Sequence, residues 1–151
     1  MDIDLLLAIG HHLAVFLLVS IFAAEFALLR PGLAGSRIGQ LARLDAAYGG
    51  VATVVIVVGI LRVIFGASGW EYYVGNSMFW AKMGAFLIMG LLTIPPTMAI
   101  RRWLKASEGD AAYAIPAAEL SANRRYLHLQ AGTLIFIPAF AAAMARGYGV
   151  S

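Results

Sequence analysis

The stretch IDLLLAIGHHLAVFLLVSIFAAEFALL, residues 3–29, decides the fold class of this chain. It is an almost wholly apolar run, and a helix needs about 20 such residues to cross a bilayer. Ionisable side chains at membrane depth are costly and nearly always face a protein interior, a cavity or a cofactor. His11, His12 and Glu25 are therefore the residues of this run that point to function.

The rest of the chain shares this apolar character. Of its 151 residues, 62% are hydrophobic and 13% are charged, whereas soluble domains carry about 25% charged residues. Three further apolar runs of spanning length cover residues 44–65, 78–100 and 126–145. The sequence predicts one all-α domain over residues 1–151, an integral membrane four-helix bundle. Because the chain starts with acidic residues where a signal peptide is basic, the first run should remain as a helix.

The basic residues predict the orientation of the bundle. They gather around the first and third connections and are missing from the second connection and the N-terminus; they are Arg30, Arg37, Arg43, Arg101, Arg102, Lys105, Arg124 and Arg125. Cytoplasmic connections carry such an excess. We therefore expect a multi-pass protein of the bacterial inner membrane with both termini outside. The net charge of +3 thus reflects membrane orientation and does not indicate nucleic-acid binding.

The absence of cysteine excludes disulfides, thiolate chemistry and cysteine-ligated metals.

A basic outer group, His11, His12, Arg62 and Lys82, has no acidic residue at matching depth except Glu71 in the second loop. Buried cations without partners are costly, so a ligand that carries carboxylates would complete this group. Haem b fits, because an imidazole binds its iron and its propionates could meet Arg62 and Lys82. The alternative is that the two cations only extend to the membrane interface and that the histidines are packing residues.

The two histidines cannot share one target, because neighbouring helical residues diverge by about 100°. Glu25 returns to within about 40° of the face of His11, so His11 is the better interior candidate and His12 faces a flank or a partner subunit. His128 lies more than about 10 Å deeper, which argues against one haem held by His11 and His128 of the same subunit. Ligation would be single, completed by Lys82, or shared across a homodimer.

A second polar group lies toward the cytoplasmic end. It comprises Glu25, Arg30, Asp45, Tyr48, Arg124 and His128, with Arg43 and Arg125 nearby. Because unpaired carboxylates are strongly disfavoured at that depth, these residues should form a neutralising network. We expect His128 to pair with Glu25 or Asp45 in preference to serving as a second haem ligand.

Short motifs suggest two relatives. His11-His12-Leu13, Arg43-Leu-Asp45 with Tyr48, Phe79-Trp-Ala-Lys82 and Ile94-Pro-Pro-Thr97 resemble an uncharacterised bacterial family of four-helix membrane proteins. Some of these features, with Gly59, more distantly resemble the HemJ-type protoporphyrinogen oxidases. That resemblance implies a b-type haem on a first-helix histidine and a functional lysine, here Lys82. It is incomplete, because Ser20 to Glu25 replace an aromatic-glycine stretch and Arg125, Tyr126 and His128 replace an acidic-proline signature.

The sequence thus predicts a haem-binding membrane protein with a redox role, either electron transfer to a quinone or oxidation of a porphyrinogen. The alternative from another class is a non-enzymatic assembly factor or transporter-like subunit whose charges only hold its helices together.

Overall fold

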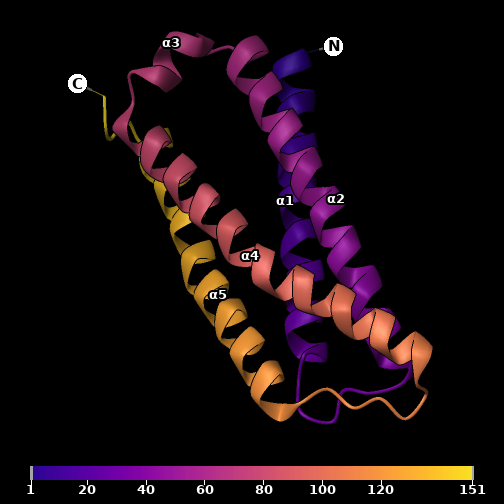
Figure 1. Ribbon diagram of the computed structural model, residues 1–151. Helices are drawn as coiled ribbons and strands as arrows, with labels where there is room; N and C mark the ends of the chain where they lie inside the picture. Colours follow the sequence, from indigo (N-terminus) through magenta and orange to yellow (C-terminus); the bar gives the residue numbers. More distant parts are fainter. Residues whose placement is uncertain (1, 151) are drawn as a thin grey trace.

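The computed structural model describes residues 2–150, which form four long helices and one short one (Figure 1). The long helices are α1 (Ile3–Leu28), α2 (Ser36–Phe65), α4 (Ser77–Gly109) and α5 (Ala117–Ala145), and the short one is α3 (Gly69–Val74). Each long helix contains a stretch apolar enough to cross a membrane. The expectation of an all-α, multi-pass membrane protein is confirmed.

The helices are arranged as two hairpins. α1 pairs with α2, α4 pairs with α5, and α2 packs on α4 to join the hairpins. The connections 29–35 and 110–116 lie at one end of the molecule, here called the connection end (Figure 1). Both chain termini and α3 lie at the opposite, terminal end, toward which the hairpins diverge (Figure 1).

Three helices extend beyond their apolar runs at the connection end. α2 begins at Ser36 and not at residue 44, α4 continues to Gly109, and α5 begins at Ala117. The third connection is therefore short, because residues 110–116 alone connect α4 to α5. The polar extensions stay helical because they bury isolated apolar side chains such as Ile38, Trp103 and Leu120.

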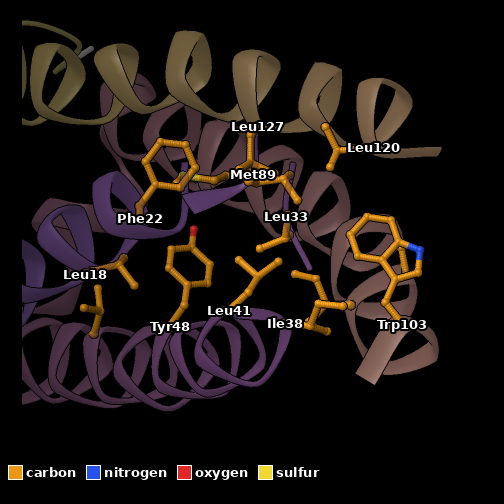
Figure 2. Close-up of a cluster of buried hydrophobic side chains, with 14 residues drawn as sticks. Leu18, Phe22, Leu33, Ile38, Leu41, Tyr48, Met89, Trp103, Leu120 and Leu127 are labelled. Carbon is orange, nitrogen blue, oxygen red and sulfur yellow. The ribbon is translucent and has the colours of Figure 1, made fainter. Parts of the chain in front are cut away.

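The core lies in the half of the molecule near the connection end. Figure 2 shows Leu18 and Phe22 of α1, Tyr48 of α2, Met89 of α4 and Leu127 of α5 in one buried cluster. Toward the terminal end, large apolar side chains are exposed instead; Phe16, Leu87 and Ile135 are 68%, 64% and 69% exposed. In a bilayer such side chains meet lipid, so the terminal half is stable without a protein core.

Hydrogen bonds join α3, the start of α4 and the residues that follow α5. The fully buried Asn76 accepts a hydrogen bond from Met78 N (2.9 Å) as the helix N-cap. Its Nδ2 donates to Tyr148 O (3.2 Å). The Tyr72 hydroxyl donates to Met144 O at 3.0 Å, so the terminal end is closed by side chain to backbone contacts.

The proline pair of α4 is accommodated by α5. Pro96 has no N–H, so the carbonyl of Leu92, one turn earlier, loses its usual helical donor. Gln130 of α5 is buried and its Nε2 donates to Leu92 O at 3.1 Å. α4 remains helical through Pro95 and Pro96, and the repair also joins α4 to α5.

Candidate functional site

Three members of the basic outer group come together at the terminal end, each from a different helix. His11 of α1 lies against Gly59 of α2, where an added Cβ would stand 3.4 Å from His11 Cε1. The charges of Arg62 on α2 and Lys82 on α4 both act on the His11 ring. These residues, His11, Arg62 and Lys82, are called the basic triad below.

The basic triad has polar atoms without partners. His11 Nδ1 and Arg62 Nε are buried and make no hydrogen bond. Between residues 2 and 150 the sole ion pair is Arg102–Glu119, so no carboxylate is in contact with the triad. The Lys82 ammonium lies 5.4 Å from the centroid of the Phe79 ring on its own helix. A buried polar atom that lacks a partner costs about 1–3 kcal/mol, which a bound acceptor would recover.

His12 turns away from the triad. It is exposed, and its Nδ1 lies 2.6 Å from Ala8 O, one turn back on α1. The ring centroids of His11 and His12 are 6.3 Å apart, with the ring planes at 87°. The structure thus turns His11 toward α2 and His12 toward the outside of the hairpin.

One carboxylate at this end was missed by the sequence analysis. An added Cβ at Gly66 would stand 3.1 Å from Asp4 Oδ1, so Asp4 lies beside the C-terminus of α2, one turn beyond Arg62. Glu71 is therefore not alone as an acidic residue near the outer group. Antiparallel pairing of the first two helices was the signal, because it brings the start of one beside the end of the other.

The second polar group lies in the core, with its two carboxylates close together. Glu25 and Asp45 are only 5% and 7% exposed, and the charge of Asp45 acts on Glu25. Thr97 Oγ1 donates to Asp45 Oδ1 at 2.6 Å, and the charge of Arg101 acts on Asp45. Among the described residues neither carboxylate has a basic group within ion-pair distance.

The basic residues expected to neutralise them are engaged elsewhere. Arg124 donates to Leu29 O, and its guanidinium lies 4.9 Å from the Phe26 ring centroid. The exposed His128 meets the same ring edge-on at 4.9 Å, and its Nδ1 lies 2.8 Å from Arg124 O. The expected pairing of His128 with Glu25 or Asp45 is not formed, because a helix carbonyl and Phe26 hold the ring. Arg30 is exposed.

Thr93 and Gln130, which are uncharged, complete this group, and the sequence analysis missed both of them. Thr93 Oγ1 lies 2.9 Å from Met89 O and 3.3 Å from Gln130 Oε1, and Tyr48 faces Thr93. Tyr48 and Thr93 line a pocket of about 150 Å³ whose walls include Leu18, Ala52, Phe86 and Met89. The available signal was the Pro-Pro-Thr motif, because Pro96 frees the carbonyl that Gln130 meets.

No cluster of three or more His, Cys, Asp or Glu side chains suited to a metal ion occurs within residues 2–150. A single imidazole is nevertheless sufficient for haem iron, because the porphyrin supplies the equatorial ligands. The basic triad therefore fits haem by its donor set: one imidazole, two cations for carboxylates, and no competing acid in contact.

A comparison with protein families matches residues 3–149 to the model of a family described as "Predicted membrane protein (DUF2214)". Neither a curated protein nor a solved structure matches the chain.

Proposed function

The chain belongs to the DUF2214 family of predicted membrane proteins, and we propose that it binds b-type haem at the basic triad. The observation that carries the proposal is the buried, unpartnered nitrogen of His11 beside Arg62 and Lys82. His11 would ligate the iron, and the two cations would bind the propionates. Bound haem would supply electron transfer, with a quinone or a porphyrinogen as the reaction partner.

The surroundings of the triad support this assignment. Gly59 leaves room for the His11 ring against α2, so the imidazole is oriented by packing. The hairpins diverge at this end and expose apolar side chains (Figure 1), which suits the apolar edges of a macrocycle. We further propose that the protein resides in a bacterial inner membrane, because its basic residues gather at the connection end.

The test is an absorption spectrum of the full chain, expressed with haem precursor supplied and purified in detergent. A Soret band is expected in the wild type and in His12→Ala, which is the matched control on the same helix. His11→Ala should lose or shift the band. Lys82→Met should reduce haem occupancy while the protein still folds, since it replaces a costly cation with an apolar side chain of similar length.

The competing reading is a non-enzymatic membrane subunit in which the triad only lies at the lipid interface. A wild type without a Soret band after haem supply would establish that reading and reject the haem site. Loss of the band in His12→Ala, with the band kept in His11→Ala, would reject the assignment of His11.

A further inference from the structure

A buried carboxylate without a counter-charge lies in the core. Glu25 is 5% exposed, and among residues 2–150 no basic group lies within ion-pair distance of its carboxylate. It lies on the same helix as Leu18 and Phe22, which form the apolar cluster of Figure 2. A carboxylate in such surroundings is costly if it is ionised.

Asp45 has the partners that Glu25 lacks. Its Oδ1 accepts a hydrogen bond of 2.6 Å from Thr97, and the positive charge of Arg101 on α4 acts on it. Asp45 lies at the height of Glu25, because Phe22 and Tyr48, one turn away on the same two antiparallel helices, have ring centroids 6.2 Å apart, and the charge of Asp45 acts on Glu25. Two like charges buried close together cannot both be maintained without a counter-charge, so one of the two carboxyl groups must carry a proton.

We propose that Glu25 and Asp45 form a proton-binding pair in the bundle core, in which Asp45 is ionised and Glu25 carries the proton. The carboxylate pair is independent of haem binding, because Glu25 lies in the last turn of α1 and His11 lies fourteen positions earlier on the same helix.

Charged or titratable groups on the helices that pack near the pair are Tyr48 on α2, Arg101 on α4, and Arg124 and His128 on α5. Arg124 and His128 are engaged by Leu29 O, Phe26 and the α5 backbone. Tyr48 carries no positive charge. The positive charge of Arg101 therefore compensates the charge of Asp45. Glu25 has no counter-charge of its own.

The ligand chemistry favours a proton over a metal cation. A small cation such as Na⁺ would need several free oxygen donors. Here Asp45 Oδ1 is engaged by Thr97, and Gln130 Oε1 lies 3.3 Å from the Thr93 hydroxyl. A proton needs one carboxyl oxygen alone, and Glu25 supplies it.

The test is infrared spectroscopy of the full chain in lipid vesicles at pH 7. The wild type should show the carbonyl band of a protonated carboxyl group, with a downshift in deuterated water. The band should be lost in Glu25→Gln and kept in Asp45→Asn. It should also be kept in Glu119→Gln, which alters a carboxylate of the exposed pair with Arg102.

Thermal unfolding supplies a second readout. Glu25→Gln imitates the protonated side chain, so its melting temperature should stay close to that of the wild type. Asp45→Asn removes the charge that faces Thr97 and Arg101, so its melting temperature should fall. A wild type without the band, a band that persists in Glu25→Gln, or a band removed by NaCl at constant pH would each overturn the proposal.

Discussion

At residue 59 the missing side chain sets the position of the His11 ring. An added Cβ would stand 3.4 Å from His11 Cε1, so a methyl group would touch the ring and a larger, branched side chain would press against it. We expect Gly59→Val to displace the imidazole and to shift the Soret band or reduce its intensity. Gly50→Val on the same helix is the matched control, because nothing lies within 4 Å of an added Cβ there. Equal spectra for the two variants would show that Gly59 does not position the ligand.

Gln130 has a defined structural role, because it replaces the backbone donor that Pro96 lacks. Gln130→Leu would leave Leu92 O unpaired in part-buried surroundings, which costs about 1–3 kcal/mol. We expect a lower melting temperature in detergent, measured by circular dichroism. Gln40→Leu provides the comparison, because Gln40 is exposed on α2. The repair role fails if both variants melt together with the wild type.

Sequence reasoning identified the residues that are rare for their surroundings and assigned no role to the common ones. His11, Glu25, Asp45 and Lys82 are conspicuous because ionisable groups in apolar runs are costly. Gly59 was noted only as part of a motif and Gln130 was missed, since glycine and polar amides occur in many bundles. Their importance depends on which helices pair and at what height, which one chain's periodicity does not reveal. The expected ion pairs failed for the same reason, because Phe26 offered His128 and Arg124 a nearer partner.

At the scale of elements, the packing of α4 against α5 at the connection end depends on Trp103. This side chain is fully buried, and its Nε1 donates to Glu119 Oε2 at 3.0 Å. We expect Trp103→Ala to destabilise the protein by about 3–5 kcal/mol, seen as loss of folded protein in a denaturant titration. Arg102→Ala should change the midpoint little, because the ion pair with Glu119 is solvent-exposed. A larger loss in Arg102→Ala than in Trp103→Ala would contradict this ranking.

The number of spanning helices could be predicted from hydropathy, whereas their ends could not. An apolar run stops where charges begin, at Arg43 before the second run and at Arg101 after the third. The helices continue past both residues, because the polar extensions still bury one side and satisfy their own backbone. The short α3 was also missed, since six residues rich in aromatics give no helical period.

For the whole molecule, the two polar groups should behave independently. The carboxylate pair lies in the core near the connection end, and the basic triad lies toward the terminal end. We expect Asp45→Ala to lower the melting temperature, because Thr97 loses its hydrogen-bond acceptor and Arg101 loses a nearby negative charge. The haem spectrum of the protein that still folds should remain largely intact. Loss of the Soret band at unchanged stability would show instead that Asp45 serves the cofactor.

The orientation of the whole bundle follows from where its cations lie. Arg30, Arg37 and Arg43 surround the first connection, five basic residues surround the third, and residues 66–76 contain none. Since both connections lie at one end (Figure 1), the positive-inside bias predicts that this end is cytoplasmic. A reporter active only in the periplasm should be active when fused to the C-terminus and inactive when inserted after Ala112, in the 110–116 connection. The opposite pattern would invert the orientation and leave the helix pairing unchanged. Equal activity at both sites would mean that the two positions share one side of the membrane, which the hairpin of α4 and α5 does not allow.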